Sequence, residues 1–333
     1  MPTGHEKTAI PSGTVSVTAM VPLNWIPAPS SGPYRDKLQT AWRLPWFPPT
    51  PRFGRRSVYT LTQSIVTTDS QTIAAKLNGE YIRAKNNNQR LSILGSRSAY
   101  SNFYVTLDRY LEYGKPNTLK VIADNACEKN SRWYSGSGIY RNVKLLLGSH
   151  VHVPADGLRI RTYDISRDSA MIEVETQIRN IARTKKKLDI RLEILQAGQQ
   201  VYEEKTAVTV FAQTDDKIRQ RFCLQQPKLW DCDDPALYQC HLSLYAGEQL
   251  LDEVWETFGI RKLEIDAFHG LRINGKQVKL RGTCIHHDNG IVGAATFEAA
   301  EDRKCRLLKQ AGFNSIRSAH HPASKALLEA CDR

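Results

Sequence analysis

Apolar and polar residues alternate in short runs from about residue 57 onward. The runs at residues 57–62, 102–107 and 117–123 each place every second side chain on an apolar face. A period of two residues is the pattern of a half-buried β-strand. We therefore expect residues 57–150 to form a β-rich domain.

A second series of alternating runs fills residues 151–262. The runs lie at residues 157–162, 170–178, 188–195, 208–211 and 238–245. Several short strands at regular spacing within one domain-sized segment are typical of an immunoglobulin-like β-sandwich. The basic run 183–187 lies between two of these strands, and we interpret it as the tip of a hairpin.

The pattern changes again at about residue 264. Residues 271–280 predict a hairpin with an Asn-Gly turn. A strand then ends in the His- and Arg-rich stretch 279–288, an amphipathic helix is expected over 296–311, and a strand over 313–319 precedes a helix over 323–331. These are two successive β/α units, and polar groups at the carboxyl ends of their strands occupy the place where α/β barrels carry out chemistry.

Proline is concentrated in the first 51 residues, which contain ten of the fifteen prolines. Proline lacks a backbone N–H and breaks helices and central strands. We therefore expect residues 1–56 to form an irregular, Pro-rich amino-terminal segment.

Charge and cysteine content limit the choice of partners. The net charge is +12, but the basic residues are spread along the chain, so we expect no nucleic-acid partner. No run of 18 apolar residues predicts a membrane span, and the first twenty residues lack the apolar core of a signal peptide. The seven cysteines show no disulfide framework or zinc spacing, which favours reduced thiols and a cytoplasmic location.

Five local motifs together resemble glycoside hydrolase family 2, the family of β-galactosidases and β-glucuronidases. They lie at residues 130–143, 229–238, 258–261, 279–288 and 311–322. The resemblance extends over roughly residues 94–333 and is strongest to bacterial-type β-galactosidases in the His-His-Asp-Asn-Gly sequence at 286–290. Residues 1–92 depart from the family pattern.

The resemblance implies a multidomain, mainly β chain. A jelly-roll-like β-sandwich of the galactose-binding type is expected at 57–150, with an atypical front part, and an immunoglobulin-like β-sandwich at 151–262. Residues 263–333 would then be the first two β/α units of a truncated TIM barrel, because a full barrel needs about 250 residues.

The implied reaction is hydrolysis of the O-glycosyl bond of terminal β-galactosides, with retention, by double displacement. The family places its two catalytic Glu residues on later barrel strands, so this chain contains neither. Glu298, Glu301 and Glu329 lie on predicted helices and are expected to face solvent. No cofactor or metal ligand is assigned to this chain; a full-length parent could bind Mg²⁺ and form a homo-oligomer.

The resemblance also implies substrate contacts. His286 and His320 would reach the sugar, while Arg317 would point into the barrel and hold the catalytic carboxylates. Residues three apart in a strand face opposite sides, so Arg317 and His320 can share the site only if the strand ends before His320. Arg132 and Trp133 would approach from the first domain, where Trp133 could stack on a pyranose ring or pack the domain interface.

Two functions of other classes stay open. A non-catalytic carbohydrate-binding protein would bind sugar through the first domain, and Trp133→Ala would abolish that binding. A structural β-sandwich protein would not respond to sugars at all. The sequence does not identify which glycoside is cut.

The 333-residue chain by itself is predicted to be inert, because it lacks the glutamate pair. The purified chain should release no chromophore from an aryl β-galactoside above a buffer blank. The control is a mock purification from the same β-galactosidase-deficient host. Turnover that co-purifies with the chain and is absent from the mock preparation contradicts the prediction.

Overall fold

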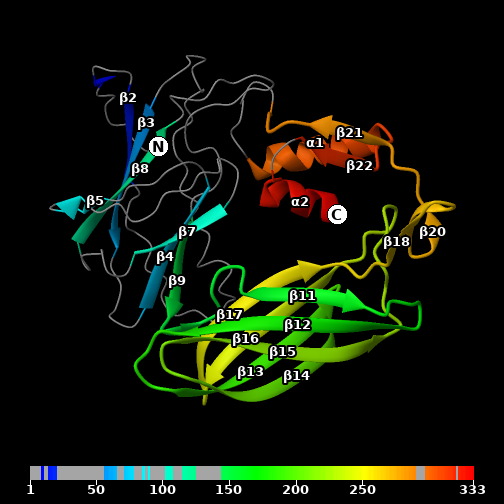
Figure 1. Cartoon of the computed structure of the whole chain (residues 1–333), viewed down its shortest axis with the longest axis horizontal. Helices are drawn as coiled ribbons and strands as arrows, with labels where there is room; N and C mark the ends of the chain where they lie inside the picture. Colours follow the sequence, from blue (N-terminus) through cyan, green and yellow to red (C-terminus); the bar gives the residue numbers. More distant parts are fainter. Residues whose placement is uncertain are drawn as a thin grey trace.

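The computed structural model describes residues 9–10, 14–20, 56–65, 71–78, 85–86, 89–90, 102–107, 115–124, 144–289, 297–319 and 322–333. Strands predominate in these residues, and two helices lie close to the carboxyl end (Figure 1). The sandwich formed by residues 151–258 occupies the lower part of the view, and the two β/α units of residues 282–332 lie above it (Figure 1).

The first region contains a four-stranded sheet, a three-stranded sheet and a small strand pair. The first sheet has the order β1 (Ala9–Ile10), β2 (Thr14–Met20), β3 (Arg56–Ile65) and β8 (Lys115–Asp124). In the second, β4 (Gln71–Asn78) lies between β7 (Asn102–Thr106) and β9 (Lys144–Ser149). The pair is β5 (Lys85–Asn86) with β6 (Gln89–Arg90).

Strands β1 and β2 correct the expectation that residues 1–56 are irregular throughout. Strand β2 pairs with β3 in parallel, from Val15 opposite Ser57 to Met20 opposite Thr62. The sequence Thr14–Met20 contains no proline and is rich in β-branched residues, which favour extended backbone. The high proline content of residues 1–51 as a whole does not apply to Thr14–Met20, which contains none.

Residues 151–258 form a β-sandwich of two antiparallel sheets. In one sheet β12 (Ser169–Asn180) pairs with β10 (Val151–His152), β11 (Leu158–Tyr163) and β15 (Thr214–Gln225). The other has the order β14 (Gln199–Val210), β13 (Lys186–Gln196), β16 (Tyr238–Ala246) and β17 (Gln249–Phe258). The largest fully buried side chains come from β12, β13 and β16: Ile172, Ile178, Leu188, Ile190, Leu192, Ile194, Tyr238 and Leu242. The predicted immunoglobulin-like sandwich is confirmed.

The basic run 183–187 is not the tip of a hairpin. Strands β12 and β13, which flank it, belong to different sheets, so the chain passes between the two layers here. Asn180 holds this crossing: its Nδ2 donates to Thr184 O at 3.0 Å, and its Oδ1 accepts from Ala182 N at 2.9 Å. Alternation identified the buried faces of both strands but not their pairing partners.

Asp252 of β17 joins one sheet of the sandwich to the backbone just after β10 in the other sheet. Its carboxylate accepts a hydrogen bond from Val153 N at 2.8 Å, and the residue is only 7% exposed. Burial raises the pKa of Asp252 to about 7. A hydrogen bond between the first region and the sandwich lies nearby in the chain, where Tyr104 of β7 donates to Asp156 Oδ2 at 2.5 Å.

A hairpin and two β/α units follow the sandwich. Strands β18 (Leu263–Asp266), β19 (Gly270–Ile273) and β20 (Lys276–Gln277) form the hairpin sheet. Asn274 and Gly275 both have positive φ, 53° and 80°, as the predicted Asn-Gly turn requires. Next come β21 (Gly282–Ile285), α1 (Glu298–Gln310), β22 (Ser315–Ser318) and α2 (Lys325–Asp332), with β21 and β22 parallel. The two predicted β/α units are confirmed.

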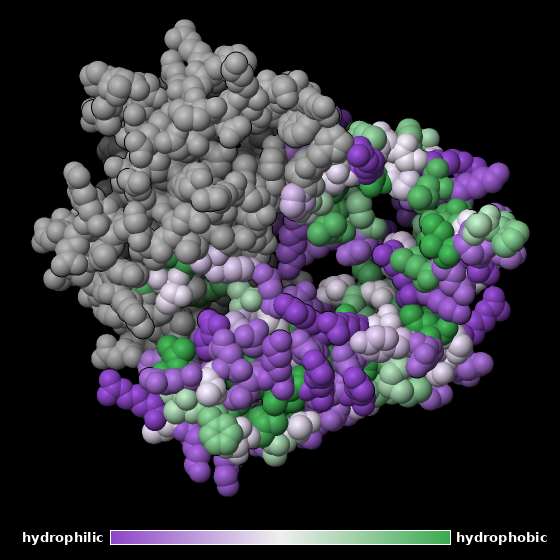
Figure 2. All heavy atoms as spheres, viewed as in Figure 1, coloured by the Kyte–Doolittle hydropathy of each residue, from purple (hydrophilic) through white to green (hydrophobic). Residues whose placement is uncertain are grey.

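Apolar side chains reach the surface in this last part of the chain. Ile265 is 81% exposed, Phe268 94% and Leu280 61%. Figure 2 shows hydrophobic side chains on this side of the molecule, whereas hydrophilic side chains cover much of the sandwich in the same view. Neither of the described helices is long and apolar enough to span a membrane.

Trp230 joins the sandwich to the hairpin and to α2. Its backbone O accepts from Asn274 Nδ2 at 3.0 Å, and its indole Nε1 donates to Asp332 O at 2.9 Å. The Arg261 guanidinium lies 4.5 Å from the ring centroid. A side chain at Gly259 would place its Cβ 3.1 Å from Trp230 Cβ, closer than most Cβ contacts, so glycine favours this close packing.

The pKa of Asp252 predicts a stability that depends on pH. Its folded-state pKa of about 7 lies above the ordinary aspartate pKa of 3.8, so the folded chain binds an extra proton between these values. The contribution of Asp252 is fully present below about pH 4 and is lost as pH rises through about 7. Asp252→Asn keeps an oxygen for Val153 N–H and should remove this dependence, which amounts to a few kcal/mol at most.

Urea denaturation between pH 4 and pH 8 measures the effect as the difference between variant and parent. The control is Asp233→Asn, which alters a carboxylate whose side chain is 83% exposed and should leave the parent's profile unchanged. A profile of Asp252→Asn that parallels the parent's across this range would show that Asp252 does not titrate there.

Candidate functional site

The carboxyl ends of β21 and β22 lie together. The strands are parallel and in register, with Cys284 opposite Arg317 and Ile285 opposite Ser318. The ladder continues one step beyond β22, because Ala319 N donates to Ile285 O at 2.9 Å. This pairing places the residue after β21, His286, beside the end of β22.

His286 is held by the neighbouring strand. Its Nδ1 lies 2.5 Å from Ala319 O, and a carbonyl can only accept, so Nδ1 carries the proton. In the neutral ring Nε2 is then the acceptor, and in the charged ring it becomes a second donor. The imidazole is therefore fixed in orientation and tautomer by the neighbouring strand.

Arg317 lies on the exposed face of the two-stranded sheet. Its Nη1 is 3.8 Å from Cys284 Sγ on the paired strand. Its neighbours Ile316 and Ser318 are less exposed, as alternation in a strand requires. The guanidinium therefore shares a face with Cys284 and projects away from the face that carries Ile316.

The loop after β21 is anchored to helix α1 through Glu301. This glutamate is 1% exposed and accepts from Asn289 Nδ2 at 3.2 Å and from Lys304 Nζ at 3.2 Å. The expectation that Glu301 faces solvent is wrong, because an amide and an ammonium group compensate for burial of its carboxylate. Glu298 is exposed, and the side chain of Glu329 is 46% exposed.

Sequence reasoning missed Asn314, which aligns the two strands at their start. Its Oδ1 accepts from Arg281 N at 2.7 Å, and its Nδ2 donates to Lys279 O at 3.0 Å. Its backbone N also donates to Arg281 O at 3.1 Å. An Asn immediately before a strand, with polar atoms of both kinds, is the signal that could have identified this role.

Three of the predicted substrate contacts, Arg132, Trp133 and His320, lie outside the described residues. Strand β22 ends at Ser318, which meets the condition under which Arg317 and His320 could serve one site. The structure thus brings His286 next to β22 and places Arg317 on that strand. The roles of all five residues stay predictions.

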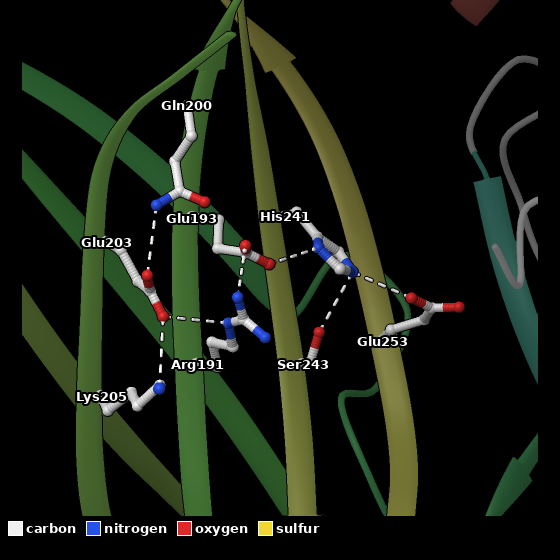
Figure 3. Close-up of polar contacts among 8 residues, drawn as sticks. All are labelled: Arg191, Glu193, Gln200, Glu203, Lys205, His241, Ser243 and Glu253. Carbon is white, nitrogen blue, oxygen red and sulfur yellow. Dashed lines mark hydrogen bonds and ion pairs between the residues drawn. The ribbon is translucent and has the colours of Figure 1, made fainter. Parts of the chain in front are cut away.

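A second histidine, His241, lies between two carboxylates on the sandwich (Figure 3). His241 Nδ1 lies 3.0 Å from Glu193 Oε2, and its Nε2 lies 2.9 Å from Glu253 Oε2 and 3.1 Å from Ser243 Oγ. The Trp255 ring stacks on the imidazole at 3.9 Å. The two carboxylates lie on opposite edges of the ring, so they do not converge on a common ligand.

The same network continues across the sheet to β14 (Figure 3). Arg191 bridges Glu193 at 3.0 Å and Glu203 at 3.1 Å, and Lys205 lies 3.5 Å from Glu203. A hydrogen bond from Gln200, with the nearby cations, keeps the pKa of Glu203 below its ordinary value. This alternation of charges across four strands is a structural ladder.

No metal site emerges from the described residues. They contain no group of three or more His, Cys, Asp or Glu side chains arranged to hold an ion. The Mg²⁺ expected of a full-length parent therefore has no fitting ligand set in the part of the chain that the structure describes.

Known proteins match both the sandwich and the β/α units. The profile described as "Glycosyl hydrolases family 2" matches residues 151–261, and that of "Glycosyl hydrolases family 2, TIM barrel domain" matches residues 264–333. A β-galactosidase of Bacteroides ovatus is 36% identical over 235 residues, covering 70% of this chain and 28% of the relative. A β-glucuronidase of Bacteroides fragilis is 26% identical over 248 residues, covering 71% and 36%.

A solved structure also matches most of this chain. The glycosyl hydrolase family 2 member from Bacteroides cellulosilyticus superposes with a TM-score of 0.78 at 32% identity, covering 83% of this chain and 38% of that one. The chain therefore spans between about a quarter and two fifths of the length of these proteins.

Removal of the Asn314 side chain is predicted to make strands β21 and β22 more mobile, because Asn314 joins them at their amino-terminal ends. Asn314→Ala deletes two hydrogen bonds at the start of β21, each worth about 1 kcal/mol at an exposed position. Amide hydrogen exchange in peptides covering β21 and β22 should become about thirtyfold faster, while exchange in the sandwich should not change.

Two further variants complete the test. Asn314→Asp keeps the acceptor but sets a carboxylate against Lys279 O, so it should loosen the strands as well. Gln310→Ala alters an exposed amide side chain at the end of α1 and serves as the matched control. Parent-like exchange in Asn314→Ala would show that the backbone ladder alone holds the strands.

Proposed function

Because the chain belongs to glycosyl hydrolase family 2, we propose that it supplies the first part of the active site of a retaining glycoside hydrolase that acts on terminal β-galactosides. The observation that carries the proposal is the position of His286 at the carboxyl end of β21, with Nδ1 bound to Ala319 O at 2.5 Å. The carboxyl ends of barrel strands are where catalytic groups of this fold gather.

The proposed role of His286 is recognition of the sugar. With Nδ1 engaged, Nε2 would contact a hydroxyl of the galactosyl unit and strengthen that contact as positive charge develops at the ring. His320 would contact the same sugar from the loop after β22. Trp133 would cover a face of the pyranose and Arg132 would bind its hydroxyls.

The proposed role of Arg317 is to hold the catalytic carboxylates. Double displacement needs a nucleophile that attacks the anomeric carbon and an acid that protonates the leaving oxygen, about 5–5.5 Å apart. Glu301 suits neither task, since it is buried on α1 and bound to Asn289 and Lys304. The guanidinium of Arg317, exposed on the face of Cys284, is suited to bind a carboxylate from another barrel strand.

The choice of a galactoside rests on the sequence at residues 286–290 and on the Bacteroides ovatus relative, which carries the name β-galactosidase. The Bacteroides fragilis relative carries the name β-glucuronidase. The two substrates differ at carbon six, where a glucuronide bears a carboxylate. A comparison of the two aryl glycosides therefore tests the substrate class directly.

The test uses the polypeptide as its gene encodes it, including any coding sequence that follows residue 333. We expect hydrolysis of an aryl β-galactoside with retention at the anomeric carbon. His286→Ala should lower kcat/KM by about 100-fold, the effect of losing one charge-assisted contact in the transition state. His269→Ala, which alters a histidine whose side chain is 65% exposed on the hairpin, is the matched control and should retain activity.

The variant His286→Asn distinguishes a sugar contact made by Nε2 from a purely structural role of the Nδ1 bond to Ala319 O. The Asn amide can replace Nδ1–H as donor to Ala319 O but has no equivalent of Nε2. Activity as low as that of His286→Ala supports the sugar contact, whereas recovery to the parent level assigns His286 a supporting role only. Preference for the glucuronide would overturn the proposed substrate class. Calorimetric binding of galactose without cleavage of any glycoside would overturn the proposed enzymatic activity and favour a carbohydrate-binding protein.

A further inference from the structure

Two cysteines meet across the interface between the helices of the β/α units. Cys305 of α1 and Cys331 of α2 have their sulfur atoms 3.8 Å apart. Cys331 is exposed and Cys305 is half-buried, so a small reagent can reach the pair from the side of α2. An ion pair between Arg333 Nη2 and Asp302 Oδ1, at 3.5 Å, joins the same two helices.

We propose that Cys305 and Cys331 are a redox-sensitive pair, which a low-molecular-weight disulfide such as oxidised glutathione converts into a disulfide between α1 and α2. A disulfide needs a sulfur separation of about 2.05 Å. The sulfurs at 3.8 Å must therefore approach further. Cys331 lies next to the last residue of α2, where the final helical turn can shift most easily.

The reaction consists of two exchange steps. The thiolate of Cys331, the more exposed sulfur, attacks one sulfur of the glutathione disulfide and releases one glutathione thiolate. The thiolate of Cys305 then attacks Sγ of Cys331 and releases the second glutathione. Two protein thiols are oxidised, one disulfide is reduced, and the two thiol protons pass to the released glutathione molecules through solvent.

Burial slows the reaction of both thiols, and the short distance between them favours their reaction with each other. Burial raises the pKa of Cys305 to about 12, with Cys331 contributing, and raises the pKa of Cys331 as well. The thiolate fraction at neutral pH is therefore small, and oxidation should accelerate as pH rises. Once glutathione is attached to Cys331, Cys305 already lies beside it. Attack of Cys305 on the mixed disulfide should therefore be faster than reaction of either cysteine with another glutathione molecule.

The bond would enclose the whole second β/α unit. The segment between the two cysteines includes β22, and thus Arg317 and the Ala319 carbonyl that holds His286. Oxidation would therefore restrict the strand that carries half of the candidate site. The consequence concerns local motion and is independent of whether the site binds a galactoside.

Other cysteines of the chain provide internal controls. Among the described residues, Cys305 and Cys331 are the pair whose sulfurs contact each other. Cys223 and Cys284 are exposed on separate strands, and Cys240 is fully buried in the sandwich. A reagent that oxidised thiols without regard to structure would modify Cys223 and Cys284 first.

The experiment incubates the folded 333-residue chain with oxidised and reduced glutathione in ratios of increasing oxidation, at pH 7 and pH 8.5. Remaining thiols are alkylated in acid and the products are mapped by mass spectrometry without reduction. We expect a linked peptide joining Cys305 to Cys331, formed about thirtyfold faster at the higher pH because the thiolate fraction rises tenfold per pH unit. Hydrogen exchange in the β22 peptide should become at least severalfold slower after oxidation.

Three variants and one denatured sample decide the outcome. Cys305→Ser should leave glutathione attached to Cys331, Cys331→Ser should leave Cys305 unmodified, and Cys223→Ser should form the linked peptide normally. Oxidation in denaturant should give mixed pairings, which would show that the fold selects the pair. Stable glutathione on Cys331 with Cys305 still open to alkylation, or links mainly to other cysteines in the folded chain, would overturn the proposal.

Discussion

The packed interior of the sandwich is the constraint on which the described structure depends. Fully buried aliphatic side chains from β12, β13 and β16 face one another between its two sheets. Both neighbouring regions attach to the sandwich at polar junctions, Tyr104 with Asp156 on one side and Trp230 with Asp332 on the other. A single hydrogen bond can set the position of a neighbouring unit only if its anchor is rigid, and close packing supplies that rigidity.

The β/α units show why such an anchor is needed. Strands β21 and β22 are four residues long each, and apolar side chains of this region such as Leu280 and Leu307 are 61% and 47% exposed. So small a sheet buries too little apolar surface to be stable alone. Its order comes from specific polar contacts, those of Asn314 at the base of the strands and of Glu301 at their loop, and from the attachment of α2 to Trp230.

The sequence predicted those features that depend on local pattern. Alternation located the sandwich strands because each buries one face, and the Asn-Gly pair located the β19–β20 turn because its backbone needs positive φ twice. Prediction failed where the burial of a residue or the pairing of a strand depends on a partner elsewhere in the chain. Glu301 is buried only because Asn289 and Lys304 meet it, and residues 183–187 cross between sheets because β13 pairs with β14 and β16. Likewise, the family motifs singled out His286, but its bond to Ala319 follows from the parallel register of β21 and β22.

Comparison of two histidines shows what distinguishes a candidate site from a structural one. His241 has Glu193 on one nitrogen and Glu253 on the other, with Trp255 against its ring, so its hydrogen-bonding capacity is used within the sheet. His286 is bound through Nδ1 by a neutral backbone carbonyl, which selects the tautomer without bringing a charge to the ring. Two carboxylates tie His241 into the sheet, whereas the Ala319 carbonyl fixes the orientation and the tautomer of His286 at the end of a strand. The parallel register of β21 and β22 places His286 at the carboxyl end of a barrel strand, and this position, rather than the presence of a histidine, favours the end of β21 as the proposed place where a sugar binds.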